Sequence, residues 1–366
     1  MAVLIVGSGG FATIAAAVAA ANPGDTLSLQ AGYANDSAMD TVQNLSLTGG
    51  GTSTGIAMTM GAGVADFTLL GSAPINVTDN ADNNVITGNT GDNVISVSGG
   101  TDTVHGGTGT DLLMVDYSNA PTGAITANIS GAAGTIADGG PHSVTFDGME
   151  NVDLTTGAGN DVITSVGGSN VFFTGDGDDT VTTSGLGNDE VHGGAGNDTI
   201  TTGAGNDLVD GGAGDDTLTG GLGVDAASYI DAASGVHVSL LTVGAQNTFG
   251  AGTDTLVGFE KLIGSQFADT LIANTTGSTL NGLNGGDDLV GGAGNDILNG
   301  GGASDFADYS LATAGVTVNL TTSGFQNTGG AGSDELISIE KLSGSNFADT
   351  LTGDSCLLYT SDAADE

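Results

Sequence analysis

Residues 184–228 form five consecutive blocks of nine residues, which read SGLGNDEVH, GGAGNDTIT, TGAGNDLVD, GGAGDDTLT and GGLGVDAAS. The fourth residue of every block is Gly, the sixth is Asp, and the eighth is aliphatic, with Ala227 closing the series. A flexible acidic linker has no reason to place an aliphatic side chain at every eighth position. The stretch therefore predicts a regular repeating structure.

Each block combines the requirements of a turn with those of a strand. Gly at the first, second and fourth positions permits a tight turn with positive φ, and the residues after Asp form a short strand whose aliphatic side chain points inward. Two blocks then make one coil of a two-sided solenoid, so aspartates 18 residues apart stack at a spacing of about 4.8 Å. Stacked carboxylates repel one another, whereas carboxylate and carbonyl oxygens together are the ligands that Ca²⁺ prefers.

Related segments extend the pattern along the chain. Residues 156–182 share the frame around a degenerate copy, and two other runs cover 78–114 and 264–308. A longer segment, 211–274, recurs in closely similar form at 291–354.

The spacers between the runs alternate apolar and polar residues. Val236, Val238 and Leu240 have their counterparts in Val316, Val318 and Leu320. This alternation is typical of strands, and it favours larger coils that continue the solenoid over linkers.

The nonapeptides resemble the RTX, or haemolysin-type, calcium-binding repeats of bacterial proteins. The resemblance implies a parallel β-roll that folds on extracellular Ca²⁺ and a protein exported through the type I secretion machinery. Residues 11–32 are similar to the opening of right-handed parallel β-helix proteins, with a short helix before Pro23 and strands at 25–29 and 41–51. A secretory signal peptide is the alternative, because residues 17–21 contain an A-x-A pattern, although no positive charge precedes them.

We therefore expect an all-β chain folded as a right-handed parallel β-solenoid, with a β-helix start followed by calcium-binding β-roll repeats. The expected divisions are a cap helix with β-helix-like coils (1–77), a first repeat run (78–114), spacer coils (115–155), the main run (156–228), spacer coils (229–263), a third run (264–308), spacer coils (309–343), the start of a truncated run (344–355) and a non-native tail (356–366).

The sixth-position aspartates are the expected side-chain ligands of several Ca²⁺ ions. They are Asp111, Asp161, Asp179, Asp189, Asp198, Asp207, Asp216, Asp225, Asp287, Asp296 and Asp305. Carbonyl oxygens of turn glycines are expected to complete these sites, namely those of Gly194, Gly196, Gly203, Gly205, Gly212, Gly214, Gly292 and Gly294.

The composition excludes several partners. The chain has 43 acidic residues and 2 basic ones, so its formal net charge is -41. Such a polyanion cannot neutralise phosphates, so we expect no nucleic-acid partner and poor binding to anionic membranes. No run of about 18 apolar residues predicts a membrane span. One Cys excludes a disulfide framework.

The last eleven residues, CLLYTSDAADE, break the pattern abruptly after Ser355. They resemble a translated sequencing-adaptor sequence, and they contain the single Cys of the chain. We therefore expect the natural protein to continue beyond this point with a further repeat run.

Two functional hypotheses follow from these observations. No His-Glu-x-x-His zinc-protease motif occurs, and the paired carboxylates stand where calcium ligands are expected, so we expect no enzymatic activity from this chain. The first hypothesis is a structural or adhesive region of an extracellular or cell-surface bacterial protein, with extracellular or cell-surface polysaccharide as a candidate partner. The alternative is the calcium-folding carrier region of a secreted enzyme (a polysaccharide lyase, an epimerase or a protease) or of a toxin.

Overall fold

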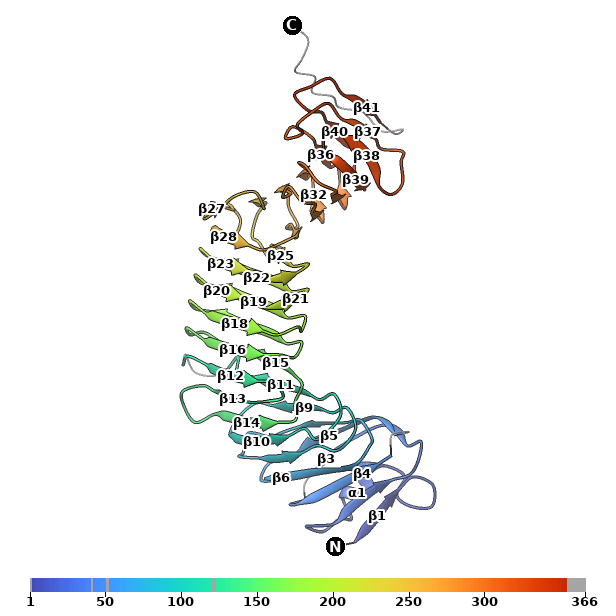
Figure 1. Ribbon diagram of the computed structural model, residues 1–366. Coiled ribbons are helices and arrows are strands. Elements are labelled where there is room, and N and C mark those ends of the chain that lie inside the picture. Colours follow the sequence, from blue (N-terminus) through green and yellow to red (C-terminus); the bar gives the residue numbers. More distant parts are fainter. Residues whose placement is uncertain (1, 41, 51–52, 120–122, 354–366) are drawn as a thin grey trace. The chain divides into compact units, whose positions relative to one another are not determined.

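The computed structural model describes residues 2–40, 42–50, 53–119 and 123–353, and the expected non-native tail lies outside them. The chain divides into two units, the first comprising residues 1–176 and 180–189 and the second residues 177–179 and 190–366. Each unit consists of short strands stacked coil upon coil (Figure 1). The prediction of an all-β chain folded as a parallel β-solenoid is therefore confirmed.

The first unit opens with a strand and a short helix. The expected helix runs from Ile14 to Val18, where it packs against the first strands, and the two expected strands form Thr26–Leu29 and Leu45–Gly49. The strand Val3–Val6, which pairs with Thr26–Leu29 in parallel, was not expected. Among the described residues, no helix is long and apolar enough to cross a lipid bilayer.

Apart from the first strand and the spacer strands, successive strands of the first unit alternate between two sheets, so that most coils contribute one strand to each. In spatial order, one sheet contains β1 (Val3–Val6), β2 (Thr26–Leu29), β4 (Leu45–Gly49), β6 (Asp66–Gly71), β8 (Val85–Thr87), β10 (Thr101–His105), β14 (Ser143–Asp147), β13 (Ala133–Ala137), β12 (Thr126–Ser130), β16 (Val162–Val166) and β18 (Thr180–Ser184). The other contains β3 (Ala34–Asp40), β5 (Thr54–Met60), β7 (Ile75–Thr78), β9 (Val94–Val97), β11 (Leu112–Asp116), β15 (Asn151–Thr155) and β17 (Val171–Asp176).

The spacer of the first unit inserts an antiparallel strand into an otherwise parallel sheet. β13 pairs antiparallel with both β12 and β14, while β14 continues from β10 and β12 leads into β16. The spacer thus continues the solenoid, as expected, but it does so with a three-stranded meander rather than a simple larger coil.

The second unit contains four principal sheets, which we name A to D. Sheet A contains β20 (Thr199–Thr201), β23 (Thr217–Thr219), β28 (Thr253–Val257) and β27 (Gln246–Asn247). Sheet B contains β19 (Glu190–Ala195), β22 (Leu208–Ala213), β25 (Ala226–Ser228), β29 (Lys261–Ile263), β31 (Thr279–Asn281), β34 (Ile297–Asn299), β39 (Gly332–Ile337) and β38 (Gln326–Gly329). Sheet C contains β26 (His237–Ser239), β30 (Thr270–Ile272), β33 (Asp288–Val290), β36 (Phe306–Asp308) and β40 (Lys341–Ser343), and sheet D contains β37 (Thr317–Asn319) and β41 (Thr350–Thr352).

Two short strand pairs accompany these sheets at the turns. They are β21 (Ala204–Gly205) with β24 (Leu222–Gly223), and β32 (Asn284–Gly285) with β35 (Gly302–Ala303).

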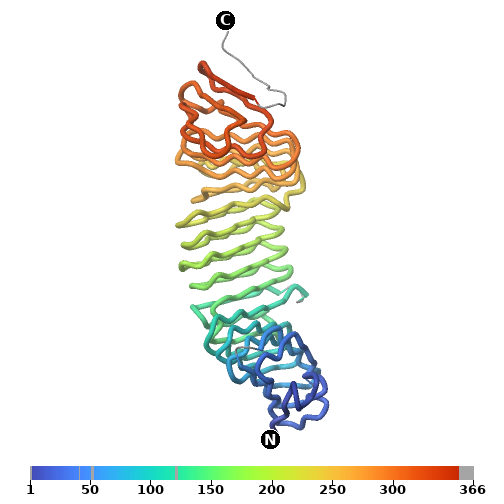
Figure 2. Tube along the Cα trace, turned by 90° about the vertical axis from the view of Figure 1, so that its right-hand side faces the viewer, coloured from blue at the N-terminus to red at the C-terminus, as the bar shows by residue number. Residues whose placement is uncertain are grey.

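The eighth position of the blocks forms the core of the second unit. Ile200 pairs in register with Leu218, and Val209 pairs with Ala227. All four side chains are fully buried. Figure 2 shows the coils of this part of the chain stacked in chain order. This stacking places each eighth position beside the eighth position 18 residues later.

The spacers of the second unit end one sheet and begin another. In the first spacer, β27 and β28 form an antiparallel pair that ends sheet A, and β26 begins sheet C. In the second, β38 and β39 end sheet B in the same way, and β37 begins sheet D. Sheet B runs through the first spacer and sheet C through the second.

The fourth and first glycines of a block are required for different reasons. A Cβ atom on the fourth-position Gly214, whose φ is +148°, would lie 1.7 Å from the carbonyl oxygen of Gly196, one coil earlier. The first-position Gly211 does not have the positive φ that we expected. Its lack of a side chain is needed instead because a Cβ atom would lie 2.3 Å from Oδ2 of Asp216.

Replacing Gly214 by Ala tests the contact between turns. We expect Gly214→Ala to lower the free energy of unfolding by about 1–3 kcal/mol more than Gly244→Ala, because its Cβ atom must displace backbone. Gly244 is the matched control, since its φ is also positive, at +95°, but nothing lies within 4 Å of its Cβ position. Urea unfolding at a fixed Ca²⁺ concentration measures both, and equal losses would contradict the stacking of the turns.

Candidate metal centre

All eleven predicted ligand aspartates are buried at the ends of turns. Each side chain is between 0% and 6% exposed. In every block the following residues form a strand, so the turn and the first strand residue hold the carboxylate between successive coils. Burial of this many acidic side chains requires a compensating interaction for each.

One oxygen of nine of these carboxylates accepts a hydrogen bond from a backbone amide of the preceding coil. The amide of Asp198 donates to Oδ1 of Asp216 at 2.8 Å, and the amide of Asp287 donates to Oδ1 of Asp305 at 2.9 Å. The amide of Asp207 likewise donates to Oδ1 of Asp225. Aspartates 18 residues apart are therefore brought together in the second unit, as the spacing predicted.

In the first unit the equivalent neighbours are not aspartates. Asp111 accepts from the amide of Asn93, Asp161 from that of Ile125, and Asp189 from that of Asn170. Asp296 in the second unit similarly accepts from Ser278. At these four sites the residue at the equivalent position of the preceding coil is therefore not acidic.

The second oxygen of many of these carboxylates has no hydrogen-bond partner. Among the described residues, buried Oδ2 atoms without a partner occur in Asp111, Asp198, Asp216, Asp225, Asp287, Asp296 and Asp305. An ionised carboxylate buried in this way is strongly unfavourable without a positive charge beside it. The chain offers only Lys261 and Lys341 for that purpose.

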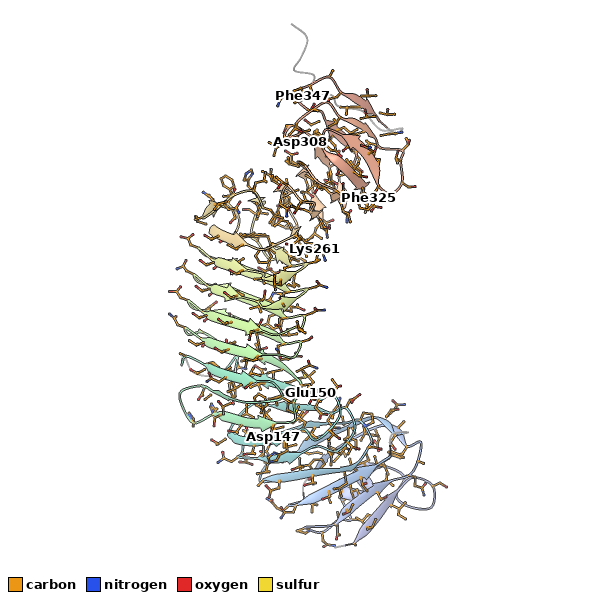
Figure 3. The ribbon with its side chains drawn as sticks, in the orientation of Figure 1. Asp147, Glu150, Lys261, Asp308, Phe325 and Phe347 are labelled. Atoms are coloured by element: carbon orange, nitrogen blue, oxygen red, sulfur yellow. The ribbon has the colours of Figure 1, made fainter. Side chains whose placement is uncertain are left out.

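The row of carboxylates that accept backbone amides from the preceding coil continues into the spacers. The nine-residue spacing did not identify the residues that form it there. The amide of Asp216 donates to Asp254, and that of Asp296 donates to Asp334. The sequences GTDTL and GSDEL keep the Asp-x-Leu part of the block, and this was the signal available. Glutamates play the same part elsewhere: Glu150, labelled in Figure 3, accepts from the amide of Asp111.

The spacer aspartates differ from the repeat aspartates in being fully satisfied by the protein. Oδ2 of Asp254 accepts hydrogen bonds from the hydroxyl groups of Thr248 and Tyr229, each at 3.1 Å. Oδ2 of Asp334 accepts from Thr328. Unpartnered Oδ2 atoms therefore occur at the repeat turns but not at these two spacer aspartates. Among the described residues they also occur in Asp40, Asp102 and Asp210.

Burial raises the pKa values of the repeat carboxylates. Loss of solvation raises the pKa of Asp198, Asp216, Asp287 and Asp296 to about 7, and neighbouring carboxylates add to the effect. Lys261, labelled in Figure 3, opposes the rise in the pKa of Asp225. The turns thus hold carboxylates whose charge is disfavoured until a cation compensates it.

The unpartnered oxygens face backbone carbonyls from the next coil. A Cβ atom on Gly193 would lie 2.2 Å from Oδ2 of Asp198 and 2.5 Å from the carbonyl oxygen of Gly211. A Cβ atom on Gly282 would likewise meet Oδ2 of Asp287 and the carbonyl oxygen of Gly300. The absence of a side chain on the first glycine of a block therefore lets two hard oxygen donors approach the same point, and such oxygens are the ligands that Ca²⁺ prefers.

The predicted glycine carbonyls lie mostly at the contacts between coils. Those of Gly194, Gly196, Gly203, Gly205, Gly214 and Gly294 face the α-carbon of a glycine in the next coil. The carbonyl of Gly203 also accepts a hydrogen bond from the amide of Leu222 at 2.9 Å. Gly212 pairs with Gly194 between β22 and β19, and Gly292 has a φ of +74°. Their role as ligands stays a prediction.

Comparison with known families agrees with this geometry. The model of the RTX calcium-binding nonapeptide repeat matches residues 78–113, 153–181, 183–218, 192–226, 263–298 and 281–309. The chain carries RTX calcium-binding repeats. All eleven predicted aspartates lie within the matched RTX segments, whereas Asp254 and Asp334 lie outside them. The comparison with curated proteins found no match to the chain.

The raised pKa values predict how the cation-free RTX coils respond to pH. An aspartate whose pKa is about 7 when folded and about 3.9 when unfolded binds its proton more tightly in the folded state. The cation-free fold should therefore be most stable at low pH and lose stability as the pH rises from about 4 to about 7. In chelator, far-UV circular dichroism should therefore show more β-structure at pH 5 than at pH 7.5, where the cation-free chain is expected to unfold.

The Asp198→Asn/Asp216→Asn double variant is the control, because it removes two of the titrating groups. Its β-structure in chelator should depend less on pH than that of the unmodified chain. β-Structure that increases between pH 5 and pH 7.5 in the unmodified chain would contradict the assignment.

Proposed function

We propose that this chain is the calcium-binding region of a secreted or cell-surface bacterial protein, that it folds on extracellular Ca²⁺, and that its role is structural or adhesive. The observation that carries the proposal is the row of buried Oδ2 atoms without partners in the RTX turns. One Ca²⁺ ion between successive turns would supply their missing partner, so several ions would bind per chain.

Calcium-dependent folding follows from the charge and from the small core. The chain has a formal net charge of -41, and each block contributes one large apolar side chain to the core. Without cations, repulsion between carboxylates favours the expanded chain. An ion that binds only the folded state stabilises that state by mass action. Extracellular sites of this kind bind with dissociation constants of about 10⁻⁴–10⁻³ M, so low cytosolic Ca²⁺ would leave the chain unfolded for type I export.

A structural or adhesive role is supported by the duplication. Residues 211–274 and 291–354 repeat the same strands and the same satisfied spacer aspartates, Asp254 and Asp334. Duplication of a whole segment lengthens a scaffold and repeats whatever surface it presents. The alternative role, as the carrier region of a secreted enzyme or toxin, requires a catalytic domain elsewhere in the natural protein.

Circular dichroism of the chelator-stripped chain tests the folding proposal directly. We expect far-UV spectra typical of an unfolded chain without divalent cations, and a cooperative transition to β-structure at about 10⁻⁴–10⁻³ M Ca²⁺. Mg²⁺ at the same concentrations should not reproduce the transition, because it demands a smaller and more rigid octahedral site. A chain that already has its full β-structure in chelator at pH 7.5 would overturn the proposal.

Substitution of two adjacent aspartates tests whether Ca²⁺ binding depends on a specific ligand or only on the negative charge of the chain. Asp216→Asn should weaken Ca²⁺ binding at its turn by about tenfold or more, because it removes a charged ligand that the buried site needs. Asp215→Asn makes the same change of charge at the neighbouring exposed position and should shift the Ca²⁺ midpoint far less. Isothermal titration calorimetry with Ca²⁺ measures both, and equal effects would argue against buried turn sites.

A further inference from the structure

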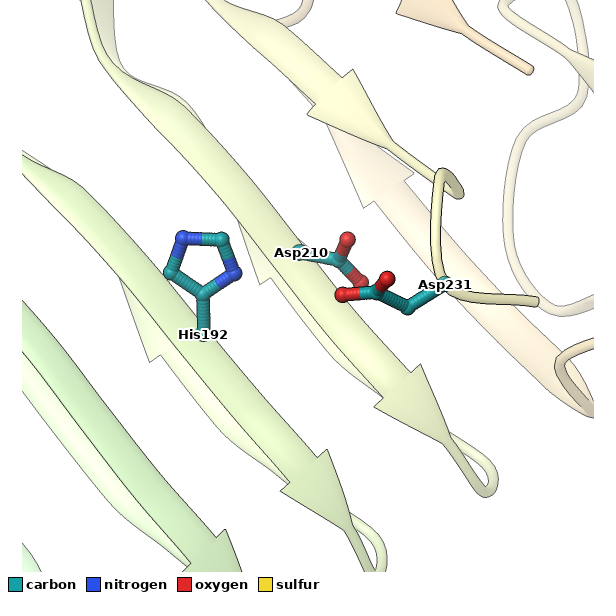
Figure 4. Close-up of side chains that lie close together, drawn as sticks. All are labelled: His192, Asp210 and Asp231. Carbon is teal, nitrogen blue, oxygen red and sulfur yellow. The ribbon is translucent and has the colours of Figure 1, made fainter. Parts of the chain in front are cut away.

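A second cluster of metal-ligating side chains lies in the second unit, outside the sixth positions of the repeat. His192, Asp210 and Asp231 place one imidazole nitrogen and two carboxylate oxygens within 4.8 Å of one another (Figure 4). His192 in β19 and Asp210 in β22 are register partners on neighbouring parallel strands. Asp231 belongs to the spacer that follows β25. The three groups thus come from three successive segments of chain.

Asp210 is the side chain that points to a ligand. It is only 4% exposed, and its Oδ1 accepts a hydrogen bond from the amide of Gly212 at 3.0 Å. Its Oδ2 is buried and has no hydrogen-bond partner among the described residues. One oxygen of this carboxylate lies within 4.8 Å of a ligand atom of His192 and of one of Asp231.

His192 is oriented in the manner of a metal-binding imidazole. Its Nε2 atom lies 2.9 Å from Oε1 of Glu190, two residues earlier on the same strand. A carboxylate that hydrogen-bonds one ring nitrogen fixes the orientation of the ring and raises the basicity of the other nitrogen. Figure 4 shows the ring on the strand beside Asp210, with Asp231 approaching from the spacer.

The surroundings of the cluster leave room for a further ligand. The three side chains line a hollow of about 180 Å³, together with small residues that include Gly194, Gly212 and Ala232. Three protein ligands beside an open space are typical of zinc sites that keep a position for water or another small ligand. The imidazole nitrogen favours Zn²⁺ and related transition metals over Ca²⁺, which takes oxygen ligands.

The nine-residue frame of the next repeat run provides an internal comparison. At the positions 80 residues later the chain has Ile272, Val290 and Leu311. Ile272 and Val290 are again register partners on neighbouring parallel strands, β30 and β33. The solenoid therefore accepts apolar residues at all three positions. The polar set around His192 is not a requirement of the fold.

We propose that His192, Asp210 and Asp231 bind one divalent transition-metal ion of the Zn²⁺ class. The ion would fasten the spacer after β25 to the repeat coils of β19 and β22, as a metal clip that closes a loop. It would also compensate the buried charge of Asp210. This site shares no ligand with the predicted calcium sites, because it uses the ninth position of two blocks and one spacer residue.

Calorimetric titration with Zn²⁺ at a fixed saturating Ca²⁺ concentration tests the site. The full chain is used with Cys356→Ser, which removes its only thiol. We expect one Zn²⁺ ion per chain at a site that His192→Ala abolishes, and an affinity that Asp231→Asn lowers by at least about tenfold. Asp231 is exposed, so its variant should fold even if the buried Asp210→Asn does not.

His105→Ala is the matched control. His105 lies 2.9 Å from one carboxylate, that of Asp147, but it belongs to no three-ligand cluster among the described residues. Its loss should leave Zn²⁺ binding unchanged. Zn²⁺ binding that survives both His192→Ala and Asp231→Asn, or that falls equally in His105→Ala, would overturn the proposal. The Ca²⁺ midpoint of His192→Ala is measured alongside and should not change, so failure of the zinc site is distinguishable from failure of the calcium sites.

Discussion

The RTX coils depend on one constraint, which is the burial of carboxylates that keep one oxygen without a hydrogen-bond partner. The first oxygen, Oδ1, joins successive coils by accepting a backbone amide from the coil before, as Asp216 does from Asp198. The second oxygen lies where a Cβ atom would stand on any residue other than glycine, as Oδ2 of Asp198 does beside Gly193. Backbone geometry, glycine usage and the demand for a cation are therefore consequences of the same buried group. The aliphatic core contributes one side chain per block and cannot compensate that burial alone.

The sequence predicted the parts of the fold that a nine-residue count can reach. Val209 and Leu218 lie in the core, and Asp207 lies next to Asp225, as the spacing predicted. In a regular coil, a fixed separation in sequence determines which residues are neighbours in space. The nine-residue spacing does not predict neighbouring residues where a spacer enlarges the coil. Asp254 lies 38 residues after Asp216, so its place in the row of carboxylates depends on how the spacer folds. For the same reason, the nine-residue spacing did not predict that β13 is inserted as an antiparallel strand.

The sequence also could not distinguish a carboxylate that needs a cation from one that the protein satisfies. Asp254 and Asp216 both precede an x-Leu pair, but only Asp254 has the hydroxyl groups of Thr248 and Tyr229 beside it. Those contacts come from residues 6 and 25 positions away, on a spacer whose path no local pattern specifies. The role of the first glycine was misjudged in a similar way. Its requirement is steric and arises from a carboxylate five residues later, not from its own φ.

The exchange of sheets at the spacers has a consequence for the geometry of long arrays. Neighbouring strands in a sheet are rotated relative to one another, and the rotation accumulates with every strand added. In the second unit, sheets A and B end at successive spacers while sheets C and D begin there. In the second unit, the number of strands in a sheet therefore depends on the spacers at which the sheet begins or ends, and not only on the number of coils. An array lengthened by copying this segment would gain coils without accumulating twist in a single sheet.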